Sequence, residues 1–150
     1  MKKYQFRLEA VLRLRKFKEE SCRMELGQLL TQLNKIDDQL AYEKKEIDSY
    51  YTIQEGALKS GMNGGQLQAF PLLVAAKERN IQLLKRDKVS QERIVEEKKQ
   101  ELAVIRGELK VIENLKEKDF EAYKKATNKK IDQKVEEQTQ IWMQHRDKKA

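Results

Sequence analysis

The fold is decided at Ser60-Gly61-Met62-Asn63-Gly64-Gly65, the only cluster of glycines in the chain. Glycine frees the backbone and commonly ends helices, so this segment predicts a break in helical structure. Pro71 follows closely and suits the first turn of a new helix, where its missing N–H costs nothing. The sequence therefore predicts one helix that ends before this segment and a second that begins just after it.

Both flanking segments carry the seven-residue apolar repeat of a coiled coil. In the first segment the two rows are Leu12, Leu26, Leu33, Leu40, Ile47 and Leu8, Cys22, Leu29, Ile36, Tyr50. In the second segment the rows are Leu67, Val74, Ile81, Val95, Leu102, Leu109 and Phe70, Leu84, Ile105, Ile112, with polar exceptions at Lys77, Lys88, Gln91 and Lys98. This pattern predicts an all-α fold, a long antiparallel two-helix coiled-coil hairpin with a longer C-terminal helix. Pairing between separate chains is the alternative.

We expect a single coiled-coil domain over residues 1–150. Within it the sequence predicts helix one over about 4–58, a tip loop over about 59–67 and helix two over about 68–146.

The two rows also predict a register. Folding back around Gly64 would place apolar residues opposite one another, in the pairs Ile47–Ile81, Leu33–Val95 and Leu26–Leu102. The same register would place the polar exceptions against apolar residues, in the pairs Lys88–Leu40, Gln91–Ile36 and Lys98–Leu29. Lysine tolerates such a position because its stem can be buried while its ammonium group reaches water.

Helix two extends beyond the reach of helix one in this register. About 25 residues after Lys124 would have no partner in the chain and would span roughly 35–40 Å as a helix. Ile131, Val135, Gln138 and Trp142 recur there at helical spacing. This segment is expected either to fray or pack back on the hairpin, or to offer its apolar stripe to a partner.

Composition limits the other possibilities. Apolar residues make up 39% of the chain and charged residues 38%, which is too polar for a thick globular core. Disorder is opposed by the regular apolar spacing and by a net charge of only +7. The single cysteine, Cys22, cannot form an internal disulfide, and the chain has no apolar run long enough to cross a bilayer. We expect a cytosolic protein without a signal peptide.

Charge concentrates at the chain ends. Residues 1–23 carry eight basic and three acidic side chains, and residues 122–150 carry eight basic and four acidic ones. Both segments would meet at one end of the hairpin and make it positive. A positive end of this kind would attract an acidic protein or a nucleic acid.

Catalytic chemistry has few candidate groups. His145 is the only histidine and lies in a lysine-rich tail, and Cys22 occupies a seam position where a small buried thiol is ordinary packing. One cysteine and one histidine cannot supply a structural zinc set, and Gly64-Gly65 lacks the Lys-Ser or Lys-Thr of a phosphate loop. The sequence predicts a protein that is not an enzyme and binds no cofactor or metal.

The opening residues Tyr4-Gln5-Phe6-Arg7-Leu8-Glu9-Ala10-Val11-Leu12-Arg13-Leu14-Arg15 resemble the start of the FliJ family of flagellar type III export proteins. That start is Phe-x-Leu-x-x-Val-Leu-x-x-Arg followed by an acidic pair, which Glu19-Glu20 supplies here. Two later segments are also similar to the family, Leu109-Lys110-Val111-Ile112-Glu113-Asn114-Leu115-Lys116-Glu117-Lys118 and Ile131-Asp132-Gln133-Lys134-Val135-Glu136-Glu137.

The resemblance implies a non-enzymatic stalk or adaptor of the bacterial flagellar type III export apparatus. Such a protein binds and regulates the hexameric export ATPase FliI and links it to the export gate protein FlhA and to export chaperones. It would be a monomeric hairpin in the cytoplasm, associated peripherally with the membrane-bound apparatus, with no membrane insertion and no nucleic acid partner.

The resemblance also implies two contact surfaces. The residues expected to face the ATPase are Arg7, Arg13, Arg15, Lys16, Lys124, Lys125, Lys129, Lys130, Ile131, Val135 and Trp142. The residues expected to face the export gate are Tyr50, Tyr51, Phe70 and Val74. Packing within the seam is the alternative role for the tip aromatic residues. The alternative functions are a coiled-coil scaffold or tether without an ATPase partner, and a basic coiled coil that binds nucleic acid.

Overall fold

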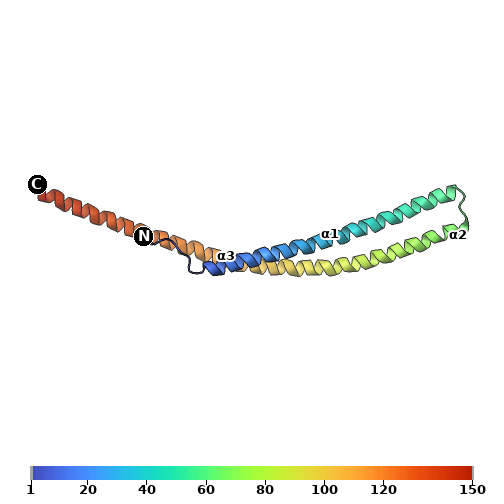
Figure 1. The fold of residues 1–150 in the computed structure, drawn as a ribbon, viewed down its shortest axis with the longest axis horizontal. Helices are drawn as coiled ribbons and strands as arrows, with labels where there is room; N and C mark the ends of the chain where they lie inside the picture. The colour runs from blue at the N-terminus through green and yellow to red at the C-terminus, as the bar shows by residue number, and fades with distance from the viewer. Residues whose placement is uncertain (1, 150) are drawn as a thin grey trace. The chain divides into compact units, whose positions relative to one another are not determined.

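The computed structural model describes residues 2–149, which form helices and contain no strand. The helices are α1 (Glu9–Lys59), α2 (Gly64–Leu67) and α3 (Ala69–Lys149), as Figure 1 shows. With 81 residues against 51, α3 is much longer than α1. The predicted all-α fold with a longer C-terminal helix is confirmed.

The connection between the long helices is built on Gly61. Its φ of 79° lies in the left-handed region, and no other residue in the described part of the chain has a positive φ. The N–H of Gly61 donates to the Leu58 carbonyl and that of Met62 to the Ala57 carbonyl, which is the hydrogen-bond pattern of a Schellman helix end. The chain therefore reverses at Gly61 rather than at Gly64, which lies inside α2.

The restart of the helix has its own cap. The side chain of Asn63 accepts hydrogen bonds from the N–H groups of Gly65, at 2.7 Å, and of Gln66, at 3.2 Å. These bonds satisfy two of the amides that the first turn of a helix leaves without partners. Pro71 lies in the first turn of α3, as predicted. Part of the predicted tip loop, residues 59–67, is thus a capped helical turn.

The chain consists of two compact units. The turn unit is Glu20–Ala103, and the terminal unit comprises Met1–Glu19 with Val104–Ala150. In the turn unit α1 and α3 pack along the predicted seam. Its buried apolar residues all occupy predicted seam positions: Cys22, Leu40, Phe70, Val74, Ile81, Val95 and Leu102.

The predicted register is wrong by one to two helical turns. Gln91 donates to the Leu29 carbonyl and to Gln32, not to a group near Ile36. Lys98 pairs with Glu25 and Lys88 with Asp37 at 2.8 Å, so the ammonium group of each lysine reaches an acidic residue of α1. Each partner lies three to seven residues nearer the start of α1 than expected, which is one to two helical turns. The cause is the position of the reversal, because a turn at Gly61 shifts every pair that follows from a turn at Gly64.

In the terminal unit the start of α1 packs antiparallel on α3. Glu9 pairs with Lys116 at 3.0 Å and Glu19 with Arg106 at 3.2 Å, so residue numbers fall along α3 as they rise along α1. Leu12 and Ile112 are the buried apolar residues of this unit. Helix one begins at Glu9 and not near Tyr4, because residues 2–6 are non-helical and Tyr4 is held by side-chain contacts with α3.

Candidate partner-binding surfaces

The C-terminal part of α3 is helical but packs on nothing else in the described chain. Every residue from 128 to 149 is exposed, and we call this segment the overhang (Figure 1). The alternative that it packs back on the hairpin is therefore wrong for this structure. An overhang is expected where α3 continues past the start of α1, and it matches the prediction of a helix end without an internal partner.

The overhang carries an exposed apolar stripe. Ile131, Val135 and Trp142 are spaced four and seven residues apart, so a helix places them on one side. Trp142 is 60% exposed, and the guanidinium carbon of Arg146 lies 5.7 Å from the centre of its ring. A large aromatic side chain with this exposure is typical of a contact surface rather than of a core.

An aromatic cluster marks the place where α3 begins to run alone. The ring of Tyr4 lies 5.0 Å from that of Phe120 and 5.2 Å from that of Tyr123. The Tyr4 hydroxyl donates to Asp119 at 3.0 Å, and the Tyr123 hydroxyl donates to the Lys2 carbonyl at 2.8 Å. Partial burial and the hydrogen bond to Asp119 raise the pKa of Tyr4. These contacts hold the N-terminal residues on α3 and fix where the overhang starts.

The structure gathers the predicted ATPase-facing residues in the terminal unit, but not all of them are available. Arg15 donates to the Glu108 carbonyl at 2.7 Å and so helps to join α1 to α3. The ammonium group of Lys124 lies 4.7 Å from the centre of the Phe120 ring. All of the predicted residues except Arg15 are exposed: Arg7, Arg13, Lys16, Lys124, Lys125, Lys129, Lys130, Ile131, Val135 and Trp142.

The predicted gate-facing residues divide into buried and exposed ones. Phe70 is only 9% exposed and Val74 only 8%, so both belong to the core of the turn unit. Tyr50 is half-buried, and its hydroxyl donates to Glu46 at 3.4 Å. Tyr51 is exposed. Of the four, Tyr51 alone offers its ring to solvent, and the others shape the tip from within.

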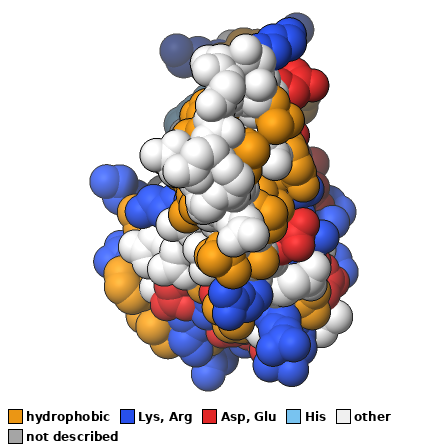
Figure 2. Space-filling model, turned by 90° about the vertical axis from the view of Figure 1, so that its right-hand side faces the viewer, with side chains coloured by type: hydrophobic (Ala, Val, Ile, Leu, Met, Phe, Trp, Pro, Cys, Tyr) orange, Lys and Arg blue, Asp and Glu red, His pale blue; other side chains and the backbone are white. Residues whose placement is uncertain are grey.

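Sequence reasoning missed most of the exposed apolar residues near the turn. We call this set the tip surface, and its members are Tyr51, Ile53, Leu58, Met62, Leu72 and Leu73. Leu72 is 73% exposed, the highest value among the large apolar residues of the described chain. Viewed from the turn end, hydrophobic and uncharged side chains gather over the upper and central part of the view (Figure 2).

A signal for the tip surface was present in the sequence. Residues 49–76 include only two charged side chains, Glu55 and Lys59, in a chain that is 38% charged. A solvated helix face needs more charge than this, and exposed apolar groups without charged neighbours typically mark interaction sites. Local depletion of charge, rather than the aromatic residues, was the pattern to follow.

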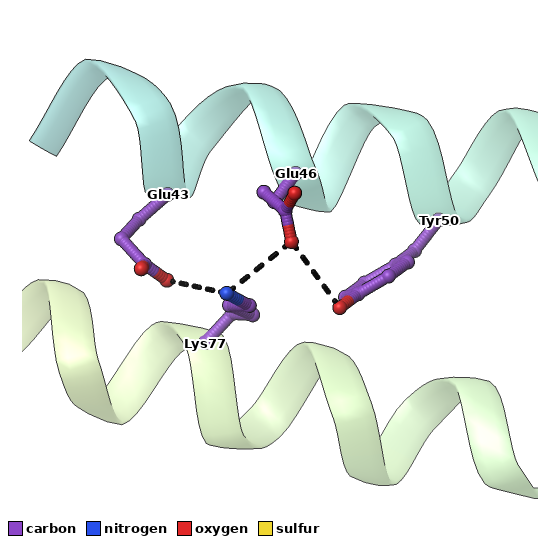
Figure 3. Close-up of polar contacts among 4 residues, drawn as sticks. All are labelled: Glu43, Glu46, Tyr50 and Lys77. Carbon is purple, nitrogen blue, oxygen red and sulfur yellow. Dashed lines mark hydrogen bonds and ion pairs between the residues drawn. The ribbon is translucent and has the colours of Figure 1, made fainter. Parts of the chain in front are cut away.

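A polar cluster fixes the two helices just behind the tip. Lys77 of α3 lies 3.1 Å from Glu43 and 3.3 Å from Glu46 of α1, as Figure 3 shows. Hydrogen bonds to Glu43 and Glu46 raise the pKa of Lys77. Hydrogen bonds from Tyr42 and Lys77 hold the pKa of Glu46 below its ordinary value. Charged groups paired across a seam can specify register, because a slipped register would leave them without partners.

The remaining chemistry of the described residues is sparse. His145 is exposed and Cys22 is buried in the seam. Within residues 2–149 no three His, Cys, Asp or Glu side chains are grouped so that they could hold a metal ion. No helix in that range has the length and apolar character needed to cross a membrane. The candidate sites are two of the exposed apolar regions of the described chain, the overhang and the tip surface.

Comparison with known proteins gives one clear result. The model of the family described as flagellar FliJ protein matches residues 4–146. Searches among curated proteins and among solved structures found no match. The matched range includes α1, most of α3 with most of the overhang, and the aromatic cluster of Tyr4, Phe120 and Tyr123. The chain therefore belongs to the flagellar FliJ family, whose members serve in flagellar protein export.

Proposed function

We propose that this protein is a non-enzymatic stalk and adaptor that binds the hexameric export ATPase FliI and connects it with the export gate protein FlhA and with export chaperones. The observation that carries this proposal is the overhang, a helix with an exposed apolar stripe and no partner in the described chain. Exposed patches of this kind are sites of protein contact in many soluble proteins.

The ATPase-binding surface is assigned to the terminal unit. Ile131, Val135 and Trp142 supply apolar contacts, and the exposed basic residues of the terminal unit supply attraction to an acidic partner. These basic residues are Arg7, Arg13, Lys16, Lys124, Lys125, Lys129 and Lys130. Arg15 contributes indirectly, since its hydrogen bond to Glu108 holds α1 against α3.

The gate-binding surface is assigned to the turn unit. Tyr51 contacts the gate together with the other residues of the tip surface, of which Leu72 is the most exposed. Phe70 and Val74 act from the core by keeping α3 seated on α1, so their truncation would disturb the tip without removing a direct contact. Since residues 49–76 are nearly uncharged, binding here should depend little on salt.

The mechanism is allosteric. A single helical stalk has no rotational symmetry, so it touches the subunits of a surrounding ring unequally. Subunits that make different contacts differ in their affinity for nucleotide, which biases where hydrolysis occurs. The stalk also favours assembly of the ring, because it binds the hexamer and not the separate subunits. It acts in the cytoplasm, at the membrane-bound apparatus.

A crossed pair of variants tests the proposal. Trp142→Glu places a charge in the overhang stripe, and Leu72→Glu places one in the tip surface; both positions are exposed, so folding should be unaffected. Trp142→Glu should abolish capture of purified FliI and stimulation of its hydrolysis while capture of the cytoplasmic part of FlhA persists. Leu72→Glu should abolish capture of the cytoplasmic part of FlhA, while capture of FliI and stimulation of its hydrolysis persist. Retained stimulation after removal of residues 125–150 would refute the assignment of the overhang to the ATPase.

A further inference from the structure

The charges of the overhang are sorted around the helix. With about 100° per residue, Ile131, Val135 and Trp142 fall within an arc of roughly 40°. Four basic residues lie within about 70° of this stripe, namely Lys124, Lys134, Arg146 and Lys149. Of the acidic residues of 122–149, Asp132 lies about 60° from the stripe, as near as Lys134, whereas Glu136, Glu137 and Asp147 lie about 100° or more away. The side of the helix that carries the stripe thus holds four basic residues and one acidic residue, and the other three acidic residues lie on the opposite side.

We propose that the overhang also binds an anionic lipid surface, lying in its plane with the apolar stripe toward the acyl chains. A helix that rests on a membrane has an apolar stripe with lysines and arginines along its margins, which reach up to the phosphates. Lys134 and Arg146 occupy such marginal positions, and Trp142 lies between them in the sequence. This role goes beyond the proposed contacts with FliI and FlhA.

The residues beside Trp142 favour lipid over a packed protein helix. Ile141 and Met143 are both exposed, and each lies about 100° from Trp142 around the axis. The three apolar side chains therefore span roughly 200°, whereas a partner helix covers a stripe of about 100°. A headgroup layer deforms around a helix and can cover the wider arc. No helix in residues 2–149 could span a bilayer, so the contact would be interfacial.

Trp142 is the only tryptophan of the chain, so its fluorescence reports on the overhang alone. The full-length protein is titrated with vesicles of phosphatidylglycerol and phosphatidylcholine, and separately with vesicles of phosphatidylcholine only. We expect a blue shift of the emission, and quenching by brominated acyl chains, with the anionic vesicles only. Raising the salt concentration should reverse the shift, because the attraction to the surface is screened.

Two double variants with the same net charge separate specific orientation from general attraction. Lys134→Gln with Arg146→Gln removes charge beside the stripe, and Lys129→Gln with Lys130→Gln removes it at least about 100° away. Each basic group near the surface contributes about fivefold to binding, so the first pair should weaken partitioning roughly 25-fold. The control pair should weaken it less than about fivefold, since its charges point away from the lipid.

Three outcomes would overturn the inference. Unchanged Trp142 emission with anionic vesicles would show that the overhang does not enter the lipid surface. Equal losses for the two double variants would show attraction without the proposed orientation. A shift produced by purified FliI but by no vesicle would assign the stripe to protein alone. Because the vesicle assay contains no ATPase, its failure would leave the proposed function untouched.

Discussion

The contrast between seam and overhang gives the sharpest prediction about stability. Leu12 is 2% exposed and belongs to the core of the terminal unit, whereas Trp142 is 60% exposed on the overhang. Leu12→Ala removes three buried carbon groups, which costs about 2.4 kcal/mol at about 0.8 kcal/mol each. The cavity left behind adds to this cost, but a narrow seam relaxes easily, so we expect a total of about 3 kcal/mol.

Trp142→Ala is the matched control. It removes a larger side chain, yet that side chain lies mostly in water, so the free energy of unfolding should change by less than about 0.5 kcal/mol. A small gain is expected, because alanine is a better helix former than tryptophan.

Thermal unfolding followed by circular dichroism at 222 nm measures both variants. A loss of about 3 kcal/mol corresponds to a fall in Tm of roughly 6–12 °C for a chain of this size. An unchanged Tm for Leu12→Ala would mean that the start of α1 is not packed on α3. A large fall for Trp142→Ala would mean that the overhang is packed against the rest of the molecule. Either result would refute the division into seam and overhang.

Three further predictions concern the turn, the polar cluster and the oligomeric state. Gly61→Ala should lower the free energy of unfolding by about 1–2 kcal/mol, because the φ of Gly61 is 79° and alanine is strained there. Gly56→Ala should raise the free energy of unfolding by about 0.5–1 kcal/mol, because Gly56 lies inside α1 and alanine is the better helix former. Urea unfolding of both variants measures these opposite changes. The pKa of Glu46 is lowered and that of Lys77 is raised, so this cluster stabilises the fold fully between their ordinary pKa values of 4.5 and 10.5. That stabilisation is lost as the pH falls through the lowered pKa of Glu46, and also as it rises through the raised pKa of Lys77. Lys77→Met should therefore lower Tm at pH 7, and this fall should shrink as the pH is lowered through the pKa of Glu46; a fall that stays the same across the acid range would contradict the role of the ion pairs. Tm should not change over a hundredfold range of protein concentration, whereas the alternative scaffold of helices paired between chains would melt higher when concentrated.

The repeat in the sequence predicted which residues are buried better than it predicted which residues meet. Leu12, Leu40, Val95 and Ile112 are buried as expected, because the spacing of apolar residues determines which side of a helix faces the seam. Register is a weaker signal, because sliding one helix by a heptad still places apolar residues against apolar residues. The conformation of a single residue, Gly61, decides it, and three glycines in the segment were possible places for the reversal.

The sequence predicts the overhang, which packs on no other segment, but it does not predict contacts between segments that are far apart in the chain. The overhang followed from counting residues on either side of the turn, and Trp142 is exposed as expected. Phe70 and Val74 share seam positions with the core, so their repeat alone could not distinguish packing from partner contact. The hydrogen bonds of Tyr4 to α3 join residues more than 100 positions apart, and local pattern carries no information about such a contact.

Hydrogen exchange of the full-length protein, alone and with purified FliI, tests the central claim most directly. In the protein alone, amides of residues 128–149 should exchange quickly, because an isolated helix without packing opens readily, while those of the seam are protected. Adding FliI should slow exchange in residues 128–149 and leave residues 49–76 unchanged. Protection that appears at residues 49–76 instead, or an overhang already protected in the protein alone, would contradict the account.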